Sequence, residues 1–387
     1  MTLQVQPVAR RITAVAWLPP HAGAAYNDAR LSFVTGSGGK HRELALWTTG
    51  NPDFADNTTD EDQTAAAAAA TLAARVTHDG DVRGIAAVAS QTIVTASSFG
   101  TVSVYQTDEG AAAAERARLE LRESMTAHRF GDSAPAAATD VAVQPGAATS
   151  DAEVASCGED GAIAYARVAR LDALQRFEVD STAVTGVCWP TSTQTAACTR
   201  AGQVKVFDRR APADVAAVLI ASQTTAAAPS SSSSALAFEC IAAHPSQSFR
   251  LATGTNAGSV LLWDTRNMRA PVIEAFNVHR ASVWDVCFDP VGSSSSFVSC
   301  SDDASLAVTQ WSADPASSSP AAADEDGSAS SSPARPVRHI SSFFNVLSVN
   351  CLDVCAFTRA SVIVAGSDSG NLLIDKVPAT DHHFRLF

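Results

Sequence analysis

The sequence predicts an all-β fold, a seven-bladed β-propeller that is closed by a strand from the N-terminus. Three observations support this prediction: two short apolar segments recur as a pair seven times, a third segment precedes each pair, and the repeats cover nearly all of the 387 residues. One such unit cannot bury both faces of its small sheet. Packing the units side by side in a closed ring buries these faces and leaves only short edges.

The first segment of each pair is a pentad that begins with larger or β-branched residues and ends with small ones. Its seven copies are "FVTGS" (33–37), "IVTAS" (93–97), "VASCG" (154–158), "TAACT" (195–199), "LATGT" (251–255), "FVSCS" (297–301) and "IVAGS" (363–367). Val, Ile, Phe and Thr favour strands, so each copy is expected to be a strand.

The second segment follows after three residues in six copies and after five in the first copy. Its copies are "ELALW" (43–47), "TVSVY" (101–105), "AIAYA" (162–166), "QVKVF" (203–207), "SVLLW" (259–263), "SLAVT" (305–309) and "NLLID" (371–375). Two strand-like runs joined by a short turn that usually contains Gly are typical of a β-hairpin.

A third strand is expected before each hairpin. The copies are "AVAWLP" (14–19), "GIAAV" (84–88), "DVAVQP" (140–145), "GVCWP" (186–190), "CIAAHP" (240–245), "DVCFDP" (285–290) and "LDVCAF" (352–357). A fourth, outer strand should come from the segments between repeats, and residues 119–124 and 215–221 are two examples. The former also suits a helix, but the architecture favours a strand. Residues 3–9 should complete the seventh blade.

The whole chain, 1–387, is interpreted as one propeller with three low-complexity inserts at 49–70, 226–235 and 313–336. These inserts are rich in Ser, Ala, Pro and acidic residues, which bury too little apolar surface to offset the entropy of ordering. They are therefore expected to be disordered surface loops.

Composition argues against several classes of function. The formal net charge is −13, whereas proteins that track phosphates need a basic surface, so no direct nucleic-acid binding is expected. No run approaches the roughly 20 apolar residues of a spanning helix, so no membrane insertion is expected. The N-terminus lacks the apolar core of a secretory signal, and the eight cysteines are expected to be reduced thiols.

The repeat resembles the WD40 family, whose blades often share a hydrogen-bonded tetrad of His, Ser or Thr, Asp, and Trp. The tetrad is incomplete here: the matching residues are His279, Ser299 and Asp303 in the sixth copy, His128 and Asp160 in the third, and Thr253 and Trp263 in the fifth. We interpret them as framework groups. No nucleophile elbow, P-loop or dinucleotide motif occurs, so we predict no enzyme, no cofactor, no metal and no small-molecule substrate.

A propeller without a catalytic site presents a ring-shaped face to partners. The position two residues before the valine or isoleucine of each first strand should lie at this face. It is occupied by Thr13, Arg83, Thr139, Thr185, Glu239, Trp284 and Leu352. We expect Trp284, Arg83, Glu239 and Leu352 to bind a partner, chiefly Trp284, since exposed Trp is enriched at binding hot spots. The alternative is that Trp284 only covers the edge of the sixth blade.

Longer stretches narrow the resemblance. "HDGDV" (78–82), "IVTASSFGTVSVY" (93–105), "HPSQSFRLATGTNAGSVLLWDTR" (244–266) and "LSVNCLDV" (347–354) are similar in order and placement to the WD-repeat nucleoporins of the Y-shaped scaffold complex of the nuclear pore. The resemblance implies a non-catalytic scaffold in the nucleus, at the nuclear pore complex of the nuclear envelope. Its implied partners are other nucleoporins, chiefly the α-helical short-arm subunit, and the assembled pore transports protein and mRNA.

A second interpretation uses the "WDTR" box at 263–266. It resembles the box of propellers that serve as substrate receptors of cullin-type ubiquitin ligases, in which case Asp264 and Arg266 would contact the ligase adaptor. "FDRR" (207–210) is a weaker copy. The structural alternative is that Asp264 and Arg266 simply end a strand. A soluble receptor for targeting peptides is a third possibility, but the ring of face residues is mostly neutral.

Overall fold

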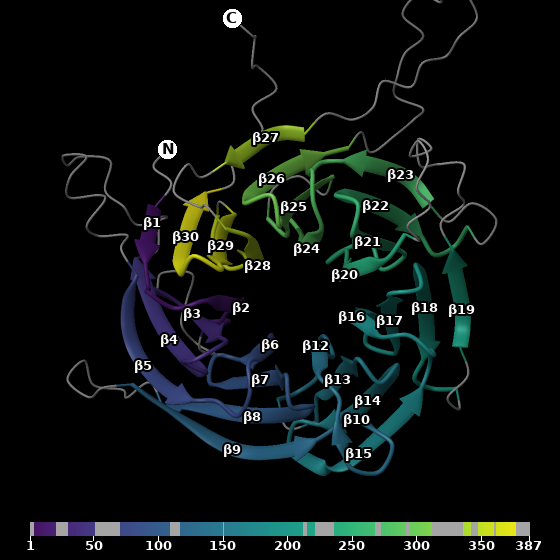
Figure 1. The fold of residues 1–387 in the computed structure, drawn as a ribbon, viewed down its shortest axis with the longest axis horizontal. Coiled ribbons are helices and arrows are strands. Elements are labelled where there is room, and N and C mark those ends of the chain that lie inside the picture. The colour runs from purple at the N-terminus through teal and green to yellow at the C-terminus, as the bar shows by residue number, and fades with distance from the viewer. Residues whose placement is uncertain are drawn as a thin grey trace, which may run out of the picture.

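The computed structural model describes residues 4–20, 30–50, 70–108, 117–149, 151–211, 215–220, 236–267, 272–291, 295–311, 336–341, 347–359 and 361–376. These residues form seven four-stranded antiparallel sheets, or blades, around a central axis (Figure 1). The predicted all-β, seven-bladed propeller is confirmed. We number the blades from the N-terminus and call the strand nearest the axis the inner strand.

The first three blades are built in chain order. Blade 1 contains β2 (Ile12–Trp17), β3 (Arg30–Ser37), β4 (Glu43–Gly50) and β5 (Thr71–Thr77). Blade 2 contains β6 (Val82–Ala89), β7 (Thr92–Ser97), β8 (Thr101–Asp108) and β9 (Arg118–Thr126). Blade 3 contains β12 (Ala138–Val143), β13 (Glu153–Gly158), β14 (Ala162–Arg167) and β15 (Arg170–Glu178).

The next three blades repeat this order. Blade 4 contains β16 (Val184–Thr191), β17 (Gln194–Thr199), β18 (Gln203–Asp208) and β19 (Val215–Ile220). Blade 5 contains β20 (Phe238–Ala243), β21 (Arg250–Thr255), β22 (Ser259–Asp264) and β23 (Val272–Asn277). Blade 6 contains β24 (Val283–Phe288), β25 (Ser296–Ser301), β26 (Ser305–Gln310) and β27 (Pro336–Ser341).

Blade 7 joins the two ends of the described chain. It contains β28 (Val349–Cys355), β29 (Val362–Ser367) and β30 (Asn371–Lys376), and β1 (Gln4–Pro7) is its outer strand. β1 pairs with β30 from Gln4 opposite Ile374 to Pro7 opposite Asn371. The predicted closure by the N-terminal strand is therefore confirmed.

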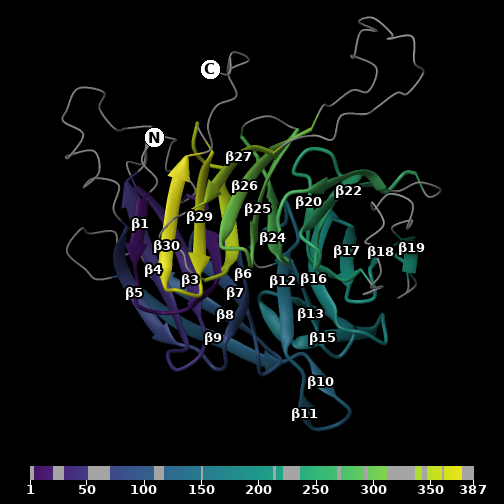
Figure 2. The same ribbon diagram turned by 45° about the horizontal axis from the view of Figure 1, so that its top comes forward.

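The predicted hairpins are confirmed in all seven blades, and both named outer strands exist as β9 and β19. The predicted inserts fall mostly outside the described residues. Their ends differ from the prediction, because Thr49 and Gly50 still belong to β4 and Pro336 begins β27. Between β9 and β12, an additional hairpin of β10 (Arg129–Phe130) and β11 (Ala134–Pro135) projects from the ring (Figure 2).

The hydrophobic core lies between blades, and each buried cluster combines side chains of two neighbouring sheets. Between blades 5 and 6, for example, Phe297 packs against Phe276 and Trp311 with ring centroids 5.5 and 6.0 Å apart. Apolar side chains point to both faces of each inner hairpin because both faces are covered. This explains why the pentads are nearly continuous apolar runs.

Glycine is required in the hairpin turns. Gly161 has φ of +72°, and a Cβ atom there would lie 2.0 Å from the main-chain oxygen of Asp180. Gly100 has φ of +77°, and its Cβ would lie 2.2 Å from the main-chain oxygen of His128. Any other residue would combine a rarely populated backbone conformation with a backbone clash. These glycines let the turns lie against the strand entries.

Three half-buried aspartates join inner strands of neighbouring blades. Each accepts a main-chain N–H from the next blade around the ring: Asp140 from Val187 at 3.1 Å, Asp285 from Leu352 at 3.0 Å and Asp353 from Trp17 at 2.7 Å. The second carboxylate oxygen accepts the N–H of the following residue. Apart from such bonds, neighbouring blades meet chiefly through apolar packing.

Candidate functional site: the rim of the central cavity

Each inner strand begins with a β-bulge, and the bulged residue lines a central cavity of about 320 Å³. We call these residues the inner ring: Thr13, Arg83, Thr139, Thr185, Glu239, Trp284 and Asn350. The structure thus brings together six of the seven residues that the sequence analysis expected at this face.

The seventh expectation, Leu352, is wrong in placement. Leu352 is only 4% exposed and packs in the core between blades 6 and 7. The reason is register: Val349 pairs with Ser367 as Val283 pairs with Ser301, so Asn350 is the counterpart of Trp284. The sequence contains the signal, since "SVN" (348–350) matches "SVW" (282–284), which makes Leu352 and not Val354 the counterpart of Val286.

Four inner-ring side chains connect neighbouring blades of the propeller. Each donates a hydrogen bond to a main-chain oxygen of the next blade: Thr13 to Val82, Thr139 to Val184, Thr185 to Phe238 and Asn350 to Ile12. Arg83, Glu239 and Trp284 form no such bond between described residues. These three are therefore the inner-ring side chains available for another role.

A second circle of residues surrounds the first and was not predicted. We call it the outer ring: Gly38, Ser98, Glu159, Arg200, Asn256, Asp302 and Asp368. Each main-chain N–H donates to the carbonyl of the residue just before the inner strand of its blade, over 2.9–3.3 Å. Because this bond recurs in all seven blades, residues at equivalent positions in different blades can be matched to one another.

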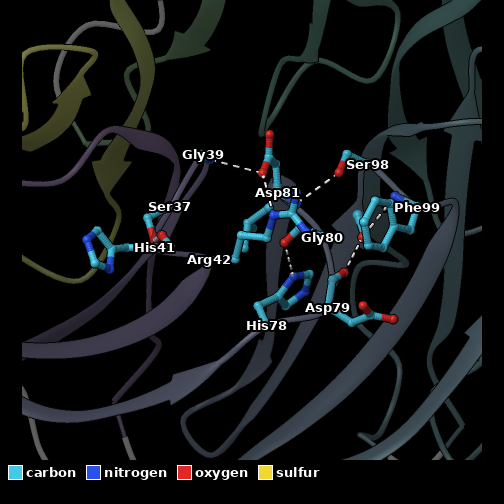
Figure 3. Close-up of polar contacts among 12 residues, drawn as sticks. Ser37, Gly39, His41, Arg42, His78, Asp79, Gly80, Asp81, Ser98 and Phe99 are labelled. Carbon is cyan, nitrogen blue, oxygen red and sulfur yellow. Dashed lines mark hydrogen bonds and ion pairs between the residues drawn. The ribbon is translucent and has the colours of Figure 1, made fainter.

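The junction between blades 1 and 2 shows how polar contacts fill this face (Figure 3). The carboxylate of Asp81 accepts hydrogen bonds from Gly39 N at 3.0 Å and Arg42 Nε at 3.1 Å. The main-chain N–H of Asp81 donates to Ser98 Oγ at 2.8 Å. The Arg42 guanidinium also lies 4.9 Å from the Phe99 ring centroid. This junction is occupied by the chain's own residues.

Charged groups dominate the rest of the rim. Arg11 pairs with Asp368 at 2.5 Å, and Arg200 approaches Glu239 at 3.8 Å. Burial raises the pKa of Glu239, while Arg200 lowers it. Three further charged residues of the cavity wall, Arg83, Glu159 and Asp302, are exposed and have no ion-pair partner in the described ranges.

A buried Ser–His–Asp arrangement occurs in blade 3. His128 Nε2 lies 2.9 Å from Ser156 Oγ, and its Nδ1 lies 2.9 Å from Asp160. Burial would raise the pKa of Asp160, but bonds from His128 and Arg176 lower it to about 2. Ser156 is 1% exposed, so a substrate cannot reach its hydroxyl. The group joins strands, as the sequence analysis predicted.

The other tetrad residues also serve the framework. His279 bonds Ser299 and Ser305 and lies 3.4 Å from Asp303. Trp263 donates to Thr253 at 2.9 Å. Trp47 and Thr35 form the same pair in blade 1, which the sequence analysis did not identify. Blades 3 and 6 thus keep the histidine, serine and aspartate of the tetrad, whereas blades 1 and 5 keep its threonine and tryptophan.

The "WDTR" box lies at the end of β22, away from the cavity rim. Asp264 accepts bonds from Arg266 Nε at 2.9 Å and Nη2 at 2.6 Å, and the guanidinium lies 3.5 Å from the Phe249 ring centroid. Asp208 and Arg210 repeat the carboxylate–guanidinium geometry in blade 4. Both boxes therefore cap a strand end.

Two kinds of feature are absent from the described residues. No three His, Cys, Asp or Glu side chains gather in a way that could hold a metal ion there. In the same part of the chain, no helix has the length and apolar character needed to cross a membrane.

Fold and rim together define a seven-bladed β-propeller whose inner ring of side chains faces a central cavity. No family model matches the chain. The chain is similar to Nucleoporin Nup43 of Mus musculus, with 25% identity over 308 residues, which cover 77% of this chain and 73% of the relative. It is also similar to Nucleoporin Nup43 of Homo sapiens, with 24% identity over 306 residues and the same coverage. The protein is thus a propeller that resembles Nup43.

Proposed function

We propose that this protein is a non-catalytic scaffold subunit of the nuclear pore complex at the nuclear envelope. The observation that carries the proposal is the similarity to two nucleoporins over about three quarters of the chain. The closed ring supports it, because β1 completes blade 7 and the propeller needs no strand from a partner. Such a rigid body suits a scaffold.

The finer proposal concerns partners and place. We infer that the chain binds other nucleoporins, chiefly the α-helical short-arm subunit of the Y-shaped complex, and thereby supports transport of protein and mRNA. The cavity rim is the proposed contact surface. Trp284 is 40% exposed there, and Arg83 has no partner among described residues. Indole and guanidinium side chains are the groups most enriched at protein-binding hot spots.

Replacing Trp284 with Ala is expected to weaken partner binding by about 30-fold, because truncating an aromatic anchor costs about 2 kcal/mol or more. The melting temperature should change little, since the indole is not part of a blade core. The measurement is co-purification of nucleoporins with a tagged chain, together with thermal unfolding. Leu121→Ala, at an exposed residue of β9 on the outer circumference, is the matched control and should retain binding.

Unchanged binding in Trp284→Ala would exclude the rim contact, and a large fall in melting temperature would favour the packing role instead. A wild-type chain that stays diffuse in the cytosol would contradict the scaffold proposal itself. The ligase alternative is tested in the same purification: it requires a cullin adaptor that is lost in Arg266→Ala.

A further inference from the structure

The rim is not uniform, and the junction between blades 6 and 7 differs from three of the other junctions. At the junction between blades 7 and 1, Asp368 of the outer ring accepts hydrogen bonds from Arg11 and from Asn350, each at 2.5 Å. At blades 4 and 5, Arg200 faces Glu239. At blades 1 and 2, Asp81 and Arg42 fill the space (Figure 3). In each of these junctions the chain supplies both charges.

Equivalence between blades places the corresponding groups at the junction between blades 6 and 7. Asn350 and Asp368 are hydrogen-bonded in blade 7, so their counterparts in blade 6, Trp284 and Asp302, occupy neighbouring positions. Arg11 bonds Asp368 from the next blade, and the counterpart of Arg11 there is Ser348. An indole, a carboxylate and a hydroxyl therefore occupy these positions at this junction, and all three line the cavity.

These three groups lack the partners that the corresponding groups have at the junctions between blades 7 and 1 and between blades 4 and 5. Asp302 is exposed and forms no ion pair with any described residue. Ser348 Oγ is buried and has no hydrogen-bond partner in the described part of the chain, although a buried hydroxyl normally finds one. Trp284 and Leu347 are 40% and 52% exposed. We call these four residues the blade 6–7 corner, and all but Leu347 line the cavity.

We propose that the blade 6–7 corner binds a lysine or arginine side chain of a protein partner. This inference rests on the proposed function, because the partner would be a nucleoporin that carries the basic residue. The cation takes the position that Arg11 occupies in the next junction, beside the outer-ring carboxylate. It lies near the indole face, which attracts cations, while Ser348 Oγ accepts one of its N–H groups.

The surroundings of the blade 6–7 corner favour a lysine or arginine side chain over an anion and over a whole helix or strand. The aliphatic stem of lysine or arginine packs on apolar surface, which Leu347 provides. The cavity holds about 320 Å³, near the lower end of the roughly 300–1,000 Å³ of ligand pockets, so it admits side chains of one segment. Two of the three basic residues that line the cavity are offset by Asp368 and Glu239, and the whole chain carries a charge of −13.

The test uses the full chain labelled with 5-fluorotryptophan, which gives one fluorine signal for each of its six tryptophans. Trp284→Phe identifies the Trp284 signal. Titration with N-acetyl-arginine amide should shift that signal alone and saturate, whereas the neutral citrulline analogue should not shift it. Asp302→Asn should weaken binding about three- to fivefold, as expected for one exposed charge pair. Asp132→Asn, at an exposed residue of the β10–β11 turn, should leave it unchanged.

An equal shift with citrulline amide, or equal affinity in Asp302→Asn, would overturn the proposal. Co-purification separates this inference from the proposed function. If wild-type chain and Asp302→Asn retain nucleoporins equally, the corner is excluded as the contact while the scaffold proposal stands. If arginine amide binds in the expected way but no nucleoporin co-purifies, the corner stands and the scaffold proposal fails.

Discussion

A chain that lacks residues 1–8 is expected to unfold roughly 4–6 °C below the full chain, because it loses the strand that closes the ring. β1 covers the edge of β30 along four paired positions. Val5 packs against the core between blades 6 and 7, and Val8 packs against the core between blades 7 and 1. Val8 N also donates to Gly370 O at 2.7 Å, and Gln6 Nε2 donates to Ala70 O at 2.9 Å.

The magnitude follows from these contacts. Each lost hydrogen bond contributes about 1 kcal/mol, and each partly buried valine adds about 1 kcal/mol, so the free energy of unfolding should fall by about 3–5 kcal/mol. Calorimetry or circular dichroism on heating measures the change. Deletion of residues 1–3 alone leaves all four pairs of β1 intact and is the control. An unchanged melting temperature in the longer deletion would refute closure by β1.

Asp285→Ala is expected to lower the free energy of unfolding by about 3 kcal/mol, because two buried N–H groups lose their acceptor. These are the N–H of Leu352, in blade 7, and that of Val286, in blade 6. The first bond joins two blades, so urea unfolding should reveal the loss directly. Asp132→Ala, at an exposed aspartate, is the control. A loss below about 1 kcal/mol would show that packing alone joins blades 6 and 7.

The same carboxyl group should make stability depend on pH. Burial raises the pKa of Asp285 to about 8, although bonds from Leu352 and Val286 oppose the shift, and burial raises the pKa of Asp140 and Asp353 to about 6. The folded state therefore holds protons that the unfolded state releases near pH 4. The contribution of the protonated Asp285 carboxyl to the free energy of unfolding is complete below that pH and decreases as the pH rises to about 8.

Asp285→Asn should reduce the slope of stability against pH between pH 6 and 8, whatever its offset in absolute stability. The upper part of the window belongs to Asp285, because Asp140 and Asp353 titrate lower. Urea unfolding at several pH values measures the slope. An unaltered slope would assign the pH dependence to other groups. Asp132→Asn again provides the exposed control.

The sequence was sufficient for the hairpins because both faces of these strands are buried, so every copy carries a strong apolar signal. The outer strands β5, β15, β23 and β27 lacked that signal and were not identified individually. β15, for example, contains many exposed polar residues. One face of an outer strand meets solvent, so its composition is only weakly constrained.

The rim was only partly predictable. Trp284 stood out because an aromatic residue replaced small or polar counterparts, but the position of blade 7 was misassigned since Val354 suits the pattern as well as Leu352 does. The aspartates Asp140, Asp285 and Asp353 resemble ordinary surface residues in the sequence. Their burial depends on the neighbouring blade, which no local pattern specifies. The outer ring was missed for a different reason: its recurring bonds use the main chain, so they impose no residue type on these positions.

The pairing of β1 with β30 has a consequence for the order in which the molecule is made. Gln4 faces Ile374, which lies 374 − 4 = 370 residues later in the chain. Among the described strands, β1 is synthesised before all others and β30 after them, so blade 7 stays incomplete until β30 has been made. Contacts so distant in sequence form late and slowly, which leaves strand edges exposed to wrong partners. Newly made chains should therefore depend on chaperones until β30 has left the ribosome.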